Sequence, residues 1–356
     1  MDDSRHENAE RPGDSRVTLS ALLERAYVFQ ITDPRDKVYA LLGLGPRWAQ
    51  QVITVDYNSE LSAVYKQTTR AILEQDHALA PWSRAGLSYQ RQQDLPSWVA
   101  DWSSFFPHCQ YSSETLGIPD RASGDSQVDV QWPFADDDSN LQTKSYKVAT
   151  ISQVGQKVIE KRAYSDQTFA PHELVAEAAH VLVMRTSLPL GETDTLDAFL
   201  RIWIGDHTGI IPTIPAPKSA LEASNTLLLD QMLAANNEDV AAVAGDNFCL
   251  REMLLLYLET AQRPKSEVYT TPLPYAALIA NRRFFITAEG YFGLGPLSTL
   301  PGDDVHIVSG GKTPYIIRPL EAPDGHALVS DAYVQELMAG EALESPGFRW
   351  QDLFVQ

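Results

Sequence analysis

The sequence has few cysteines and no long apolar run, and each shortage excludes a class of protein. Among 356 residues the two cysteines, Cys109 and Cys249, stand far apart and outside any CxxC or Cys/His spacing. A disulfide framework is excluded, and a reducing, cytoplasmic location is expected. No stretch approaches the roughly 18 apolar residues of a membrane span. The polar leader at 1–16 also lacks the apolar core of a signal peptide.

Positive charge is scarce as well. The chain has 28 lysines and arginines against 47 aspartates and glutamates, a formal net charge of -19. Such a chain repels phosphate backbones and anionic lipid unless basic residues cluster locally, and the sequence has no such cluster. We therefore expect binding neither to nucleic acid nor to membranes.

Motifs of known catalytic or cofactor chemistry are missing too. No Gly-x-Ser-x-Gly elbow is present, so the grouping of Ser97, His108 and Asp101 gives little support for a hydrolase triad. His172 and His180 are eight residues apart, which places them on different faces of a helix and argues against a zinc protease site. We expect no metal and no cofactor.

What is present predicts an α+β fold, with a mostly helical body and a small, barrel-like, antiparallel C-terminal β-module. Apolar residues recur at helical spacing over 17–30 and 59–75, whereas 146–158 has an extended pattern. Asp33 to Gly43 is interpreted as a complete short helix, capped by Asp33 and ended by Gly43. After residue 282, β-branched runs are separated by turns, of which Gly310-Gly311 is the clearest hairpin signal.

Composition also divides the chain. The segment 112–143 is polar and rich in Ser, Asp and Gly, which marks a loop or a boundary. We expect a disordered leader at 1–16, a helical region at 17–111, a polar loop or linker at 112–143, a mixed, mainly helical region at 144–281, a β-rich module at 282–343 and a tail at 344–356.

Several segments, in this order, resemble the fungal heterokaryon-incompatibility (HET domain) protein family. They are Asp33-Pro-Arg-Asp-Lys-Val-Tyr-Ala-Leu-Leu-Gly-Leu44, Val55-Asp-Tyr57, Leu95-Pro-Ser-Trp-Val-Ala-Asp-Trp-Ser103, Arg282-Arg-Phe-Phe-Ile-Thr287, Gly290-Tyr-Phe-Gly-Leu-Gly-Pro296 and Arg318-Pro319. The resemblance is to the region downstream of the HET domain, and we expect that domain itself to be missing from this chain. The death-inducing activity of the HET domain therefore does not carry over.

The resemblance implies a non-catalytic regulatory or recognition region that modulates fungal non-self recognition or programmed cell death. Its expected partner is a protein, one with a HET domain being a candidate. The alternative, from another class, is a cofactor-free small-molecule enzyme of fungal secondary metabolism, of the cyclase or isomerase type.

Candidate site residues follow from both hypotheses. Trp98 and Trp102, with Asp101 between them, form either an aromatic pocket with a carboxylate for acid/base work or a buried aromatic corner in which Asp101 caps a turn. In an enzyme, Asp101 and His108 would be catalytic. The expected binding residues are Trp98, Trp102, Asp101, Arg318 and Tyr333.

Two further polar sets have competing interpretations. The charged helix start is interpreted as a structural motif made of Asp33, Arg35, Asp36, Lys37 and Gly43. Along the predicted strands, polar residues either form a ligand-binding face or, more commonly, point to solvent. This second set is Asp303, His306, Arg318, Asp331 and Tyr333.

Overall fold

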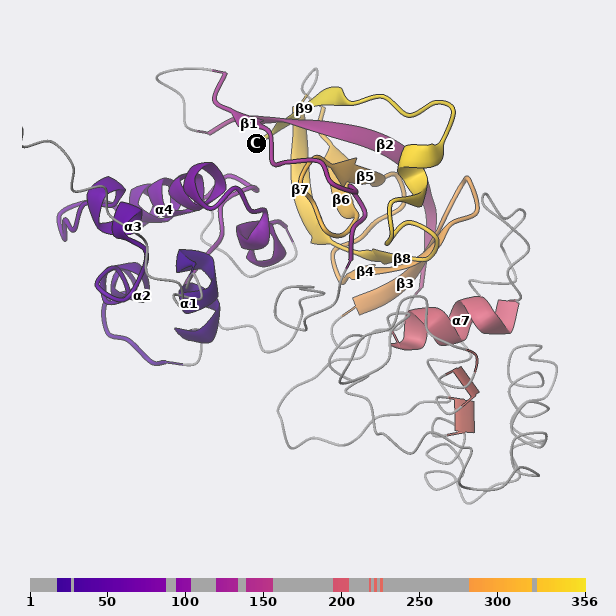
Figure 1. The fold of residues 1–356 in the computed structure, drawn as a ribbon, viewed down its shortest axis with the longest axis horizontal. Coiled ribbons are helices and arrows are strands. Elements are labelled where there is room, and N and C mark those ends of the chain that lie inside the picture. The colour runs from indigo at the N-terminus through magenta and orange to yellow at the C-terminus, as the bar shows by residue number, and fades with distance from the viewer. Residues whose placement is uncertain are drawn as a thin grey trace, which may run out of the picture.

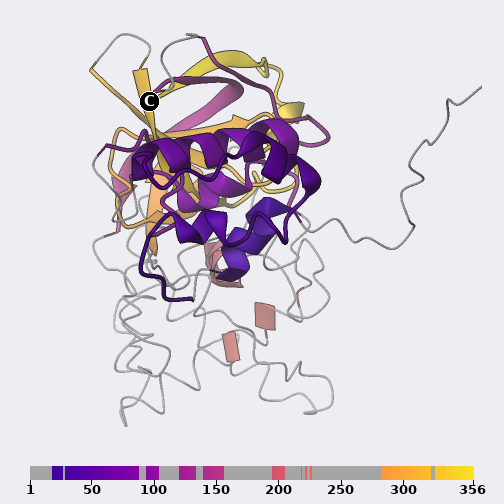
Figure 2. The ribbon, with the colours of Figure 1, turned by 90° about the vertical axis from the view of Figure 1, so that its left-hand side faces the viewer.

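The computed structural model describes residues 18–26, 29–87, 94–103, 120–133, 139–155, 195–204, 218, 221–222, 225–226, 282–321 and 325–356. Within these ranges the N-terminal helices form one group and the strands another, and the two groups lie side by side (Figure 1). After a quarter turn the helices lie in front of the strands (Figure 2). His108, His172 and His180 lie outside the described residues.

The helical group begins with α1 and ends with a 3₁₀ turn. Its elements are α1 (Leu19–Arg25), α2 (Asp36–Tyr39), α3 (Arg47–Val52), α4 (Leu61–Gln75) and η2 (Ala80–Arg84); a separate helix, α7, spans Thr195–Ile204. The Thr18 hydroxyl caps α1 by accepting a hydrogen bond from Ala21 N at 3.2 Å. The buried side of α4 includes Val64 and Ile72, as its helical spacing predicts.

The predicted helix from Asp33 to Gly43 is shorter in the structure. Helix α2 covers four residues, and Asp33 caps the turn before it by accepting a hydrogen bond from Arg35 N at 3.0 Å. Beyond Tyr39 the backbone bonds mostly join residues three apart, so the segment continues as tight turns. Gly43 has no positive φ, and a Cβ added there would meet no atom within 4 Å. The interpretation of Asp33 to Gly43 as one complete helix ended by Gly43 was therefore wrong, because α2 ends at Tyr39.

Within the described ranges, nine strands form one sheet. They are β1 (Val130–Gln131), β2 (Leu141–Val154), β3 (Arg282–Thr287), β4 (Phe292–Pro296), β5 (Asp304–Val308), β6 (Tyr315–Pro319), β7 (Gly325–Asp331), β8 (Tyr333–Val334) and β9 (Gln351–Val355). All pairings are antiparallel except β7 with β9, which is parallel.

The pairings close into a barrel. From β5 the order runs through β6, β7 and β9 to β2, and β2 pairs back with β5. A second circuit, completed by the chain itself and not by strand pairing, leaves the other end of β2 through β3 and β4 to β8, which follows β7 in the sequence after one residue. Both circuits share β2, whose 14 residues are long enough to pair with β9 at one end and with β3 at the other.

The expected C-terminal barrel is therefore confirmed, and it is larger than the segment 282–343. Strands β2 and β9 lie outside that segment, and the first circuit does not close without them. The expected helical body stays a prediction, because most of 156–281 lies outside the described residues. No described helix is both long enough and apolar enough to cross a membrane.

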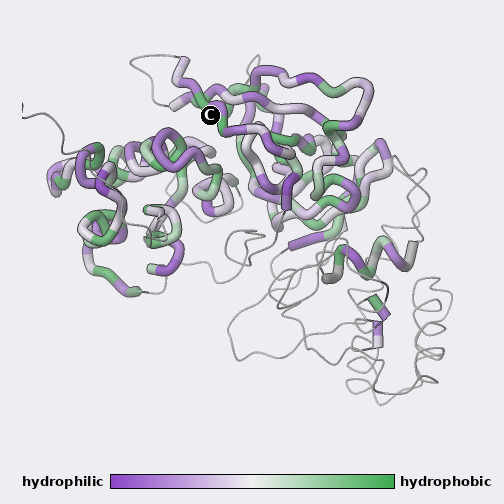
Figure 3. Tube along the Cα trace, in the orientation of Figure 1, coloured by the Kyte–Doolittle hydropathy of each residue, from purple (hydrophilic) through white to green (hydrophobic). Residues whose placement is uncertain are grey.

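The barrel strands have two buried faces. One lines the interior and includes Phe285, Val305 and Ile316. A Cβ at Gly295 in β4 would lie 2.6 Å from Ile316 Cδ1, and since β4 and β6 do not pair, these side chains meet across the interior. The other face packs on the helices. Hydrophobic and hydrophilic residues are interspersed along both groups (Figure 3).

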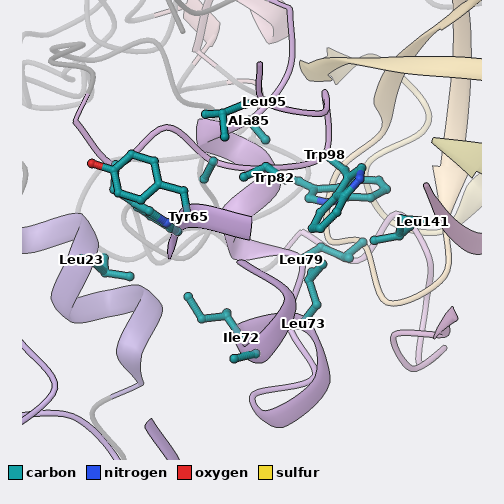
Figure 4. Packing of buried hydrophobic residues seen from close by; sticks show 14 of the residues in the cluster. Leu23, Tyr65, Ile72, Leu73, Leu79, Trp82, Ala85, Leu95, Trp98 and Leu141 are labelled. Carbon is teal, nitrogen blue, oxygen red and sulfur yellow. The ribbon is translucent and has the colours of Figure 1, made fainter. Parts of the chain in front are cut away.

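The core between the helices and the barrel is built around tryptophans. Trp82 and Trp98 are fully buried there, and Leu141 of β2 belongs to the same cluster. Figure 4 shows Trp98 beside Leu141, between the helical segment and the strands. Burial of several such side chains, each contributing about 1.5–3 kcal/mol, couples the folding of the two groups.

Candidate functional site

The predicted aromatic site around Trp98 lies within the core. Trp98 is fully buried, donates from Nε1 to Ser139 O at 3.0 Å and packs on Trp132 with ring centroids 5.0 Å apart. Asp101, also buried, accepts hydrogen bonds from Ser103 N at 2.9 Å and Ser103 Oγ at 2.6 Å. This geometry corresponds to the aromatic corner with a capped turn, one of the two arrangements expected. Trp102 is buried beside it.

The other expected binding residues do not join this corner. Arg318 makes two bonds to the Asp303 carboxylate, at 2.7 and 2.9 Å, and donates to Ser298 O at 2.7 Å. Tyr333 is 1% exposed and lies in β8 opposite Leu294. Neither side chain shares a contact with Trp98 in the interactions described.

The polar residues along the strands are mostly buried, not solvent-exposed as the commoner expectation held. His306 is 6% exposed, and its Nδ1 lies 3.0 Å from Ser145 Oγ. Asp331 is 1% exposed and is paired with Arg282 at 2.6 Å. Closed pairing buries both faces of these strands, so their polar groups require protein partners instead of water.

The charged motif at the start of α2 organises a neighbouring loop. Arg35 donates to both carboxylate oxygens of Asp33, at 3.0 and 2.8 Å. Its other terminal nitrogen donates to the backbone oxygens of Tyr57 and Ser59. These bonds lower the pKa of Asp33 and raise that of Arg35. Asp36 accepts a bond from the Tyr57 hydroxyl at 2.6 Å, which raises the pKa of that hydroxyl.

Lys37 of the same motif points the other way. Its buried ammonium donates to Ala26 O at 3.2 Å and Phe29 O at 2.6 Å, and burial together with nearby Arg84 lowers its pKa. Lys37 thus ties the end of α1 to α2. Arg35 and Lys37 of this motif both bond to backbone oxygens of neighbouring segments.

We call residues 54–59 the recognition arm. Ile53 anchors its start in the core, whereas residues 54–58 are all exposed. The Asp56 carboxylate accepts from Asn58 N at 2.9 Å and from Ser59 Oγ at 2.9 Å, and the Tyr39 hydroxyl donates to Asp56 O at 3.1 Å. The arm is therefore an ordered loop, fixed by hydrogen bonds along its length.

Two large apolar side chains are exposed on this arm. Val55 is 52% and Tyr57 51% exposed. The Tyr57 ring packs edge-on against Tyr39 at 5.3 Å and lies 5.5 Å from the Arg35 guanidinium. Among the described residues, eight large hydrophobic side chains are exposed, and five of them fall between positions 29 and 57: Phe29, Leu44, Val52, Val55 and Tyr57.

The arm combines features of protein-binding sites. Interface energy concentrates on tyrosine, tryptophan and arginine side chains set among apolar neighbours. A loop already fixed in one conformation loses little entropy on binding. Sequence reasoning identified the two motifs at 33–44 and 55–57 separately, but only the fold shows that the first holds the second. The signal in the sequence that could have linked the two motifs was a Val-x-Tyr segment, which the structure shows to be exposed, together with an Asp-rich turn.

Metal binding has no support here, since no group of metal-ligating side chains occurs among the described residues.

Comparisons with known proteins agree with the barrel. Residues 234–354 match the family model of the Het-6 beta-barrel domain. The chain is 23% identical over 373 aligned residues to "Heterokaryon incompatibility protein 6, OR allele" of Neurospora crassa, an alignment that covers 93% of this chain and 52% of that protein. The chain thus spans about half the length of this curated relative. No solved structure matches. The barrel agrees with these two matches, and together they support the resemblance to a region of a heterokaryon-incompatibility (HET) family protein.

Proposed function

We propose that this chain is a non-catalytic recognition region that modulates fungal non-self recognition or programmed cell death by binding a protein partner through the recognition arm. The observation that carries the proposal is the exposed, anchored pair Val55 and Tyr57. The relative's printed name supports the biological process, and a protein with a HET domain is the first partner to test.

The recognition arm has already lost much of its conformational freedom before it binds a partner. Tyr57 is held by its hydroxyl bond to Asp36 and by its contact with Tyr39, so its ring has little freedom left to lose. Half of its surface nevertheless remains exposed. Burying the exposed part of such a ring in a partner adds hydrophobic and cation–π energy without further ordering of the loop.

The apolar setting favours a protein over a small molecule. Val55 and Tyr57 are half-exposed on an arm that is exposed throughout residues 54–58. Protein interfaces engage such exposed apolar side chains, whereas small molecules are held in concave sites. The net charge of -19 additionally favours a partner with a basic surface around its apolar contact.

The experiment is affinity capture of the tagged chain from fungal lysate, with proteins and small molecules identified by mass spectrometry. Val55→Ser and Tyr57→Ser together should reduce recovery of a stoichiometric protein partner at least about tenfold. The matched control is Leu300→Ser with Leu320→Ser, since these side chains are 46% and 37% exposed on the barrel. Undiminished capture by the arm variant would contradict the site, and a bound metabolite without a protein would favour the enzyme alternative.

A further inference from the structure

The recognition arm begins with backbone groups that have no partner. Among the interactions of the described residues, none involves the backbone of Thr54 or Val55. Ile53, which follows α3, is extended, with φ of -97° and ψ of 111°, and residues 54–56 lie in no helix or turn. The chain therefore continues here without the hydrogen bonds that a helix or a sheet would supply.

The Tyr39 hydroxyl shows which edge of this stretch faces outward. Asp56 N donates to that hydroxyl at 3.3 Å, and the hydroxyl donates to Asp56 O at 3.1 Å. In extended backbone the N–H and C=O of one residue point to the same edge, and those of the next residue point to the opposite edge. Because Tyr39 is buried, Asp56 turns its edge toward the protein, and the N–H and C=O of Val55 point away from it.

The surroundings of Val55 are open and partly apolar. Residues 54–58 are all exposed, and about half of the surface of the Val55 and Tyr57 side chains remains accessible. An N–H and a C=O on one outward edge are the two groups that a residue exchanges with a paired strand. Peptides that add as a strand gain affinity from such main-chain bonds and specificity from the side chains beside them.

The free charges beside Val55 are of one sign. In residues 54–60 the charged side chains are Asp56 and Glu60, both exposed. Glu60 is the N-cap residue of α4, but its side chain makes no cap bond. The cation that contacts this arm, Arg35, is already paired with Asp33 at 2.8 Å. A strand that pairs here therefore meets negative charge, which favours lysine or arginine in that strand.

We propose that the recognition arm binds an extended, basic segment of its protein partner, which pairs with the backbone of Val55 and places an apolar side chain against Tyr57. This inference rests on the proposed function and specifies the chemistry of the partner. Covering Val55 removes water from its N–H and C=O, which costs free energy unless the partner bonds to both. A helix has already paired its own backbone groups, whereas an extended segment can supply both bonds.

The test is ligand-observed NMR on the full chain with capped hexapeptides of alternating lysine and valine, or of alternating glutamate and valine. The lysine peptide should bind with a Kd on the order of 1 mM or tighter, and more tightly than the glutamate peptide. A copy of the lysine peptide with every backbone nitrogen methylated keeps its charge but loses its donors, and should bind about tenfold more weakly.

Variants of the chain test the same contact from the other side. Val55→Pro removes the outward N–H and should weaken binding of the lysine peptide about 5- to 10-fold, whereas Val55→Ile keeps it and should bind like wild type. Glu60→Gln should weaken binding about 2- to 5-fold. Its matched control is Glu321→Gln, since that glutamate is exposed on the barrel.

Equal binding of the methylated and unmethylated lysine peptides would overturn strand pairing, and this comparison uses the wild-type chain, so it does not depend on the folding of any variant. Tighter binding of the glutamate peptide would overturn the basic character of the partner. The proposed function fails separately: it is refuted when Val55→Ser with Tyr57→Ser leaves partner capture undiminished. Capture that depends on the arm, together with equal binding of the two lysine peptides, refutes strand pairing alone.

Discussion

The buried ion pair between Arg282 and Asp331 gives the most decisive test of the barrel. The two side chains are 1% and 2% exposed, and Arg282 Nη2 lies 2.6 Å from Asp331 Oδ1. Arg282 also donates to the Asp331 backbone oxygen at 3.1 Å. The pair joins β3 directly to the end of β7. Without it, the second circuit connects these two strands only through β4 and β8. Asp331→Ala removes this carboxylate from a buried guanidinium.

The expected loss is about 3–5 kcal/mol in the free energy of unfolding, because a buried charge loses its partner while its own desolvation cost remains. Arg282→Met with Asp331→Leu removes both charges at similar volume and should recover most of that loss. Urea unfolding followed by the fluorescence of the seven tryptophans measures both variants. Urea is chosen because guanidinium chloride screens ion pairs.

The exposed pair of Lys144 with Asp352, at 2.7 Å, is the matched control. Its side chains are 35% and 45% exposed, so Asp352→Asn should cost less than about 1 kcal/mol. If Asp331→Ala also lost under about 1 kcal/mol, or if the apolar double variant were as unstable as the single one, the reasoning from burial would be refuted.

Three further predictions concern pH, glycine and the extent of the barrel. Burial lowers the pKa of His306 from 6.5 to about 4, so between pH 4 and 6.5 the unfolded chain binds more protons than the folded one. The free energy of unfolding, measured from urea midpoints, should be highest above pH 6.5 and should fall by about 3 kcal/mol as the pH drops toward 4. Gly86 has a φ of +97°, and an added Cβ would lie 2.3 Å from Val329 O. Gly86→Ala should therefore lower the free energy of unfolding by about 2 kcal/mol or more in the same assay, whereas Gly43→Ala should be neutral or stabilising. A chain limited to 234–354 should show no cooperative thermal unfolding by circular dichroism, and one that also includes 139–155 should regain it, because β2 closes both circuits.

Local patterns in the sequence predicted the elements better than their partners. The spacing of α4 and the glycine pair at 310–311 each depend on neighbouring residues, and both features appear in the structure. The extended pattern from residue 146 is also present, as part of β2. That β2 pairs with strands about 150 residues later is a non-local property, and no periodicity encodes it.

The candidate site divides in the same way. The sequence around Asp33 predicted a capped, charged turn, because capping depends on neighbouring residues. They could not predict that Arg35 reaches Tyr57, since that contact spans 22 residues and depends on how α2 and the recognition arm pack. Burial of His306 and Asp331 was missed for a related reason. Strand alternation assigns one face to solvent, whereas here the helices cover that face.

The position of β9 in the chain has a consequence for synthesis. The Ser97 backbone nitrogen and hydroxyl both donate to Gln356 O, and the same hydroxyl accepts from Leu328 N, so one serine links the helical segment, β7 and the residue after β9. On a ribosome adding about 5–20 residues per second, β9 emerges roughly 14–55 s after α4 is complete. Throughout that interval the first circuit of the barrel cannot close, and the part of the helix-facing core that contains Leu353 and Val355 of β9 is missing. The nascent chain is therefore prone to aggregate until β9 has been synthesised, and chaperone binding should concentrate on ribosomes that have passed α4 but have not yet synthesised β9.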